Sequence, residues 1–237
     1  MQRRALGLIT LFALVLTATA QQTATTPKPP ATHHAKAHQA ASADQIWAGL
    51  MEGNKRFVAG KPKARELVSL RKSLATGQHP HVAVLACSDS RVAPELVFDQ
   101  NLGDLFVVRS AGNIADAIGV GSLEYAVEHL GTSVLVVLGH TKCGAVTAAC
   151  SGEKMPTSNL QAIVDKISPA VAQASQSVKG NELVESAIKE NVHQSAKDVL
   201  ASSDVLRHFV DDGKLKVFEA EYDIDSGEVV RLDAGSR

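Results

Sequence analysis

The feature that most constrains the fold is an uninterrupted apolar run at residues 133–138, Ser-Val-Leu-Val-Val-Leu. A β-branched run of this length without a charge predicts a strand buried on both faces, as in a parallel sheet. Similar short runs occupy residues 81–86 and 105–109, and helical spacing marks residues 65–75 and 119–130. This order of strands and helices predicts right-handed crossovers, and therefore an α/β fold whose central sheet is mainly parallel and flanked by helices.

The rest of the folded part contributes further helices and a hairpin. Ser42 begins the sequence Ser-Ala-Asp-Gln, which predicts a helix N-cap before apolar residues at helical spacing. No internal repeat is visible. The later elements expected from the pattern are helices near residues 160–176, 181–201 and 205–211, a strand at 215–222, and a return strand at 228–232 after the turn Asp225-Ser226-Gly227.

The N-terminus has the composition of an export signal. Arg3 and Arg4 precede an almost wholly apolar stretch, residues 5–16, and Thr-Ala-Thr-Ala then offers a cleavage site after Ala20. The apolar run is shorter than the roughly 18 to 20 residues that span a bilayer, so no stable membrane span is expected after cleavage. We therefore predict a signal peptide at 1–20, a periplasmic or secreted protein, a disordered leader rich in Thr, Pro, Ala and His at 21–41, and a folded domain at 42–237.

Charge and cysteine content exclude two classes of protein. The chain carries 24 basic and 25 acidic residues, a formal net charge of -1, which gives no reason to expect a nucleic acid partner. Three cysteines are too few for a disulfide scaffold. Cys87 and Cys143 lie in turns that carry Gly, Ser or Asp, whereas Cys150 lies in an Ala-rich stretch and is interpreted as a small buried apolar residue.

Soft metal ligands follow two of the predicted strands. Cys87 begins Cys-Ser-Asp-Ser-Arg after one strand, and His140 and Cys143 lie in His-Thr-Lys-Cys after another. The carboxyl ends of parallel strands meet at one edge, so these side chains can converge there. Thiolate and imidazole are the ligands that zinc prefers, and three protein ligands leave a fourth position open for water, as in catalytic sites. Cys150 lies too far into the following helix to complete a structural site.

Asp89 and Arg91 come just after the first cysteine. The aspartate could accept a hydrogen bond from the water that the metal activates, with Arg91 keeping the carboxylate ionised and oriented. Alternatively, Asp89 could become a fourth ligand and close the site. Zinc lowers the pKa of water from about 15.7 to about 7 in favourable sites, which makes a hydroxide nucleophile available.

With these motifs, the chain resembles the β-class carbonic anhydrases from about Trp47 to Leu232. The most specific pieces are Cys87-Ser-Asp-Ser-Arg91 and Gly139-His-Thr-Lys-Cys-Gly144, supported by residues 49–57, 103–109 and 124–127. The resemblance implies dimers or higher homo-oligomers whose N-terminal helices embrace the neighbouring subunit, and reversible hydration of carbon dioxide to bicarbonate by a zinc enzyme, a carbonate dehydratase.

The resemblance also implies a role for each matching residue. It makes Cys87, His140 and Cys143 the zinc ligands and Asp89 and Arg91 the catalytic dyad. The residues that it places in the substrate pocket are Gln78, which binds substrate oxygen across the dimer interface, the aromatic pair Phe106 and Tyr125, and Gly144, which offers its backbone N–H to bicarbonate.

Two positions refine this picture. Members of the family that close the site with the aspartate have a tryptophan where this chain has Val84, so the resemblance implies the open, unregulated type. Ser110 and Ala111 depart from many relatives and could change pocket access or substrate preference. A hydrolase for carbonyl sulfide or carbon disulfide on the same scaffold and a non-catalytic bicarbonate- or zinc-binding module remain alternative functions.

Overall fold

A computed structural model describes residues 41–232 of the chain. The predicted signal peptide and the leader up to residue 40 lie outside the described residues. Between residues 41 and 232, no helix combines the length and the apolar character that a membrane crossing requires.

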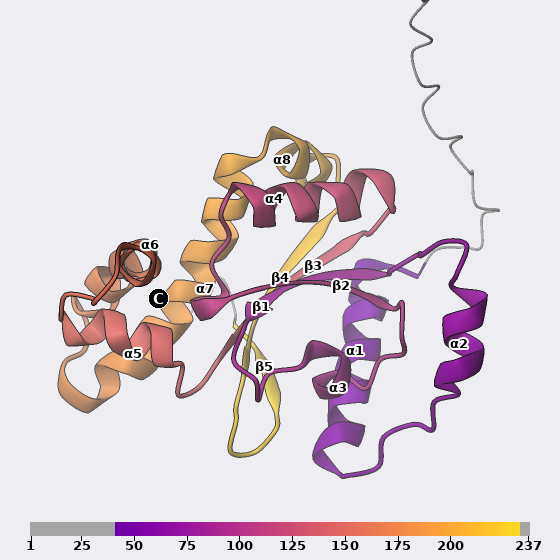
Figure 1. Cartoon of the computed structure of the whole chain (residues 1–237), viewed down its shortest axis with the longest axis horizontal. Coiled ribbons are helices and arrows are strands. Elements are labelled where there is room, and N and C mark those ends of the chain that lie inside the picture. Colours follow the sequence, from indigo (N-terminus) through magenta and orange to yellow (C-terminus); the bar gives the residue numbers. More distant parts are fainter. Residues whose placement is uncertain (1–40, 233–237) are drawn as a thin grey trace, which may run out of the picture. The chain divides into compact units, whose positions relative to one another are not determined.

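The elements of the described chain alternate much as the sequence predicts (Figure 1). The strands are β1 (Val82–Cys87), β2 (Leu105–Ser110), β3 (Val134–His140), β4 (Lys216–Tyr222) and β5 (Val229–Arg231). The helices are α1 (Ala43–Val58), α2 (Leu67–Ser73), α3 (Pro94–Val97), α4 (Ala117–Glu124), α5 (Gly144–Ser151), α6 (Ser158–Ala174), α7 (Leu183–Ser202) and α8 (Asp204–Asp211), with short helical turns η1 (Ala111–Asn113), η2 (Tyr125–His129) and η3 (Gly180–Glu182).

The five strands form one sheet in the order β2-β1-β3-β4-β5. The first four strands are parallel, and only β5 pairs antiparallel, with β4. Every residue of β1 and β3 is buried. The prediction of a mainly parallel sheet is confirmed, and its charge-free runs form β1 and β3, the two strands with a parallel neighbour on each side.

Helices cover both faces of the sheet (Figure 1). On one face α1 packs against alternate residues of the strands, and its Trp47 ring stacks on Phe218 of β4 with 4.9 Å between ring centroids. On the other face α4, α7 and α8 bury Leu123, Val192 and Leu206 against the sheet. The carboxyl ends of β1 and β3 lie against a third cluster, formed with α5, α6 and α7.

Most element boundaries agree with the sequence to within a few residues, and the differences have local causes. The helix predicted to begin at Gly119 begins at Ala117, because Asp116 caps it by accepting a hydrogen bond from the Gly119 N–H. It then continues as a π-helical turn, Tyr125–His129. The four-residue helix α3 was not predicted, since one turn is too short to show periodicity.

Glu221 is a buried carboxylate inside this fold. It lies on β4, beside Gly139 in the register, and is 6% exposed. Burial raises its pKa, and the charges of Asp223 and Glu185 raise it further, against the opposing charges of Lys189 and His140. An acid whose pKa is raised on folding loses stability as pH rises from its unfolded value through its folded value.

We therefore expect Glu221→Gln to melt at a higher temperature than the parent chain at about pH 8, with the difference vanishing near pH 4. Glu219→Gln is the matched control, because Glu219 lies two residues earlier on β4 and pairs with His193. Glu219→Gln removes the partner of His193, so this variant should not raise the melting temperature at either pH. Thermal unfolding of the three proteins at both pH values checks this, and a stability gain for Glu221→Gln that does not change with pH would contradict it.

Candidate metal centre

The three predicted zinc ligands meet at one edge of the sheet. Cys87 ends β1, His140 ends β3, and Cys143 directly precedes α5. Their donor atoms all lie within 4.8 Å of one another, and all three side chains are buried. Lys142, between the second and third ligands, has a φ of 58°, a strained value for a residue with a side chain, and this turn brings Cys143 back toward His140.

The donor set fits a metal ion. The Nδ1 atom of His140 lies 2.9 Å from the carbonyl oxygen of Thr141, so Nδ1 donates its hydrogen there and Nε2 presents a lone pair. That Nε2 atom is buried and has no hydrogen-bond partner in the described chain. A buried nitrogen left unpaired beside two thiols costs free energy, and coordination of zinc would offset it.

The two thiols differ in acidity. A hydrogen bond from Cys143 lowers the pKa of Cys87 against the effect of burial, and the same pairing raises the pKa of Cys143. The backbone N–H groups of Asp89 and Gly112 also lie 3.4 and 3.3 Å from the Cys87 sulfur. The protein is therefore arranged to hold negative charge on Cys87, which a buried site tolerates when a cation balances it.

Asp89 and Arg91 form a close pair beside the ligands. Arg91 donates from Nε to Oδ1 at 2.9 Å and from its terminal nitrogen to Oδ2 at 2.7 Å. These hydrogen bonds, opposed by partial burial, hold the pKa of Asp89 well below its usual range. Oδ2 lies 4.0 Å from Nε2 of His140. Of the two roles considered for Asp89, the structure has the carboxylate engaged by Arg91, with the three donors grouped without it.

Arg109 fixes the backbone of the same loop, and sequence reasoning missed it. From β2 it donates to the carbonyl oxygen of Cys87 at 2.9 Å and to that of Asp89 at 2.6 Å. Its conformation holds the segment between the first ligand and the aspartate. The residue lies in a stretch that carries the family resemblance, but contacts to carbonyl groups at the end of β1 and in the loop after it have no signature in the local sequence.

The structure separates the predicted pocket residues into two groups. Gly144 begins α5, next to Cys143. Gln78 is exposed and precedes β1, at the opposite end of that strand from Cys87. Phe106 and Tyr125 lie together with 6.2 Å between ring centroids, but Phe106 is in register with Ala83, whereas Ser110 is in register with Cys87. Four residues of strand correspond to about 13 Å, so one chain does not bring these three side chains to its own ligands.

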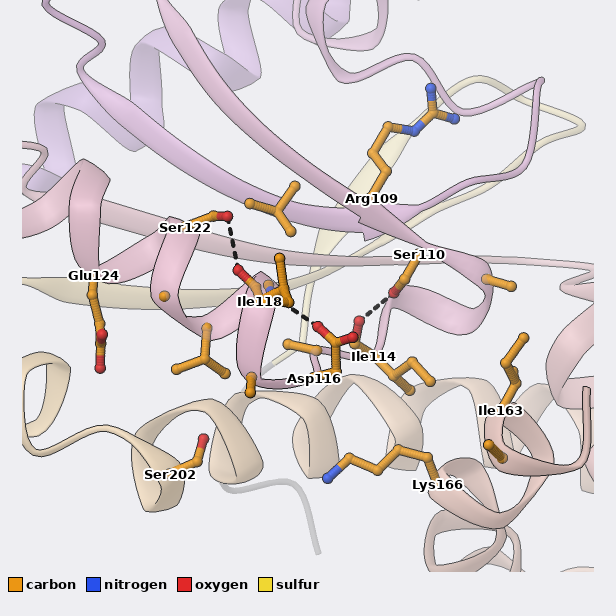
Figure 2. A pocket seen from close by; sticks show the side chains of 18 residues that line it. Arg109, Ser110, Ile114, Asp116, Ile118, Ser122, Glu124, Ile163, Lys166 and Ser202 are labelled. Atoms are coloured by element: carbon orange, nitrogen blue, oxygen red, sulfur yellow. Dashed lines mark hydrogen bonds between the residues drawn. The ribbon is translucent and has the colours of Figure 1, made fainter. Parts of the chain in front are cut away.

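A groove of about 1060 Å³ opens beside the ligand edge. Its walls come from the end of β2, from α4 and from α6 (Figure 2). Ser110 and Ala111, the two positions at which the sequence departs from many relatives, line it. The Ser110 hydroxyl donates to the carbonyl oxygen of Ile114, which fixes this part of the wall. Ile118, also in the lining, is 79% exposed, so the groove is an open surface rather than a closed cavity.

Comparison with known proteins gives a consistent result. The carbonic anhydrase family matches residues 82–229. The chain is 38% identical over 191 residues to carbonic anhydrase 2 of Mycobacterium tuberculosis, which covers 79% of this chain and 91% of that protein. Two solved structures are similar: a β-carbonic anhydrase of Aspergillus fumigatus, with a TM-score of 0.66, 29% identity and 81% and 93% of the two chains covered, and tetrameric β-carbonic anhydrases of Sordaria macrospora, with a TM-score of 0.64, 25% identity and 81% and 99% covered.

The family match covers most of the sheet and both ligand motifs, and the buried cysteines and histidine form the donor set of a zinc site. This chain therefore belongs to the β-class carbonic anhydrase family, as a carbonate dehydratase that interconverts carbon dioxide and bicarbonate.

Proposed function

We propose that Cys87, His140 and Cys143 hold the zinc ion on which this hydration depends, and that Asp89 and Arg91 orient the attacking water. The observation that carries the proposal is the unpartnered Nε2 atom of His140, buried beside two thiols and 4.0 Å from the carboxylate that Arg91 holds. A bound zinc ion would act as a Lewis acid and make a hydroxide nucleophile available near neutral pH.

Asp89, Arg91 and Arg109 orient the nucleophile. Asp89 stays ionised at neutral pH because Arg91 lowers its pKa, so the carboxylate can only accept a hydrogen bond. It accepts one from the nucleophile and so points an oxygen lone pair toward the carbon of the substrate. Arg109 keeps Asp89 in place by holding the carbonyl groups on both sides of Ser88. Preorganisation of this kind lowers the barrier because little has to move during the reaction.

Gly144 supports the assignment of a pocket at the start of α5. A side-chain carbon at this position would meet nothing within 4 Å, so open space adjoins the backbone there. The first N–H groups of a helix carry partial positive charge and favour anions. We propose that this helix start stabilises the charge that develops on the substrate oxygens as bicarbonate forms.

Stopped-flow measurement of carbon dioxide hydration by the zinc-loaded protein, from about pH 6.5 to 9, tests the proposal. We expect fast hydration that exceeds turnover of carbonyl sulfide under the same conditions. Bound zinc with no hydration at any pH would refute the mechanism. Rapid carbonyl sulfide hydrolysis in that case would favour the hydrolase, and turnover of neither substrate would favour a binding module.

We further propose that the active form is a homodimer or higher oligomer in which Gln78, Phe106 and Tyr125 serve the partner's zinc site. Three observations support this. These side chains lie away from the ligands of their own chain, β2 is an edge strand of the sheet that residues 41–232 form, and Ile118 is exposed in the adjoining groove. The tetrameric Sordaria enzymes show that similar chains assemble.

Complementation between two inactive variants tests this arrangement. Gln78→Leu retains the ligands but lacks the glutamine, whereas Cys87→Ser retains the glutamine but lacks a ligand. If Gln78 acts across the interface, co-expression should restore about a quarter of parental activity, because about half of the dimers are mixed and each mixed dimer has one intact site. The separately purified variants, assayed alone, are the controls. No recovery in verified mixed dimers would place Gln78 in its own chain's site.

We also propose that the protein is exported and that residues 1–20 are removed. The charged start, the short apolar stretch and the small residues before Gln21 support this. Expression with its native N-terminus in a bacterium, followed by fractionation and N-terminal sequencing, should yield a periplasmic or secreted protein that begins at Gln21. Recovery of the intact N-terminus in the cytoplasm would refute the proposal.

A further inference from the structure

The sulfur of Cys87 accepts a hydrogen bond from a backbone turn that lies far from it in sequence. The N–H of Gly112 lies 3.3 Å from the Cys87 sulfur, in the turn η1 that follows β2. Gly112 has a φ of 76° and Asn113 a φ of 46°, so two consecutive residues are left-handed. A residue with a side chain, such as Asn113, is strained in this conformation, which persists only when its surroundings hold it. The turn therefore needs an external support.

Asn191 of α7 supplies that support. Its Nδ2 atom donates to the carbonyl oxygen of Gly112 at 2.7 Å, and it also lies 3.4 Å from Oδ1 of Asn113. Asn191 is 1% exposed, and its own Oδ1 has no hydrogen-bond partner among residues 41–232. Burial of an amide is costly, so the contact with the turn is the interaction that offsets its desolvation.

Gly112 is thus held from both sides. Its N–H meets the Cys87 sulfur, and its carbonyl group meets Asn191. Packing closes the remaining space, because a side-chain carbon on Gly112 would lie 2.6 Å from Cδ1 of Ile167. If the Asn191 amide were lost, the carbonyl group would have no donor and the left-handed turn could relax, which would withdraw the N–H from the sulfur.

We infer that Asn191 is a positioning residue for the metal centre, acting through Gly112 on the charge and orientation of the Cys87 thiolate. The inference rests on the proposed ligation by Cys87 and adds a residue 79 positions away from the turn that it holds. Hydrogen bonds to a ligand atom set how much charge the ligand donates and how firmly it is oriented, and loss of such partners typically costs about 10–100-fold in metal affinity or activity.

Asn191→Leu tests the inference, because leucine has a similar volume and cannot donate a hydrogen bond. The full chain is loaded with zinc, and zinc transfer to an excess of a colorimetric chelator is timed. The same variant is loaded with cobalt, and its thiolate-to-metal charge-transfer band is recorded. We expect zinc release at least about tenfold faster than in the parent chain and a shifted cobalt band.

Ser195→Ala is the matched control. Ser195 lies one turn further along α7, is 2% exposed, and its hydroxyl has no hydrogen-bond partner in the described chain. This variant should keep both the parental release rate and the parental cobalt band, whatever its melting temperature. If Asn191 had only a structural role, Asn191→Leu would lower the melting temperature but leave the zinc release rate and the cobalt band unchanged.

Parental zinc release together with an unchanged cobalt band in Asn191→Leu would overturn the inference. If that variant does not fold, Asn191→Ala, which removes the amide without placing a larger group near the turn, is subjected to the same two measurements with the same expectations. Failure of the underlying ligand assignment is distinguishable, because Cys87→Ser would then still bind zinc as the parent chain does.

Discussion

Asn in place of Asp89 is expected to lower carbon dioxide hydration by roughly a hundredfold or more, while zinc binding stays at about one ion per chain. The substitution keeps the size of the side chain, but the amide is neutral and can present an N–H where the carboxylate only accepts. Because Asp89 accepts three hydrogen bonds from Arg91, the pair itself should loosen. Stopped-flow hydration and metal analysis of the same preparation separate loss of chemistry from loss of metal.

The pH dependence of the hydration rate gives a second test of the role of Asp89. Arg91 holds the pKa of Asp89 well below its usual range, so Asp89 remains ionised across neutral pH. Any rise or fall in the hydration rate of the parent enzyme between about pH 6.5 and 9, a limb of its pH profile, therefore reports the titration of another group. Asp89→Asn should lower the rate at every pH and leave that limb in place. A limb that disappears in the variant would contradict the assignment.

Asp225→Asn provides a matched control for the loss of a carboxylate near this edge. Asp225 lies in the turn before β5 and forms an ion pair with Lys142 in which both side chains are exposed. Exposed pairs contribute about 0–1 kcal/mol, so hydration should remain close to the parental rate. Equal losses in the two aspartate variants would indicate a general electrostatic effect at this edge rather than a specific role for Asp89.

The convergence of the three candidate zinc ligands could be predicted from sequence because their positions follow from strong local signals. Two charge-free strands end at Cys87 and His140, and parallel neighbours must present their carboxyl ends at one edge. Only two residues, Thr141 and Lys142, separate His140 from Cys143, so the turn brings Cys143 to the same point. The chemistry of the side chains and the direction of the strands were therefore sufficient, and the 4.8 Å grouping confirms the convergence.

The residues that support the ligands could not be predicted in the same way. Arg109 and Asn191 act on backbone carbonyl groups far from them in sequence, and any residue can present a carbonyl group. The left-handed residue Asn113 likewise lies in a turn that contacts β1, β3 and α7, all distant from it in sequence. Such contacts are fixed by tertiary structure, and neither periodicity nor residue type indicates them.

Gln78, Phe106 and Tyr125 illustrate a different limit. Their residue types suit a substrate pocket, yet in one chain they lie away from the ligands. A sequence indicates that such side chains belong to a site, but symmetry decides which copy of the chain receives them. Their proposed assignment to the pocket therefore depends on assembly, which the complementation experiment tests for Gln78.

Replacement of Cys87 by serine is expected to have the largest effect on the metal centre, reducing both zinc content and hydration to background. A serine hydroxyl is not ionised at neutral pH and is a harder, weaker donor than a thiolate, so the site would retain only two suitable ligands. The loss should exceed the roughly 10–100-fold cost of removing a partner that acts through a ligand, which places the effect above that expected for Asn191→Leu.

Cys150→Ser is the control for this substitution, since it makes the same chemical change outside the donor group. Cys150 is half-buried on α5 and does not belong to the three grouped donors. It should retain parental zinc content and hydration, with at most a small loss of thermal stability. Metal analysis after dialysis against a weak chelator, followed by stopped-flow hydration, distinguishes the variants. Full zinc content in Cys87→Ser would contradict ligation by Cys87 and require a different donor at this edge, and loss of zinc from Cys150→Ser would show that the centre extends into α5.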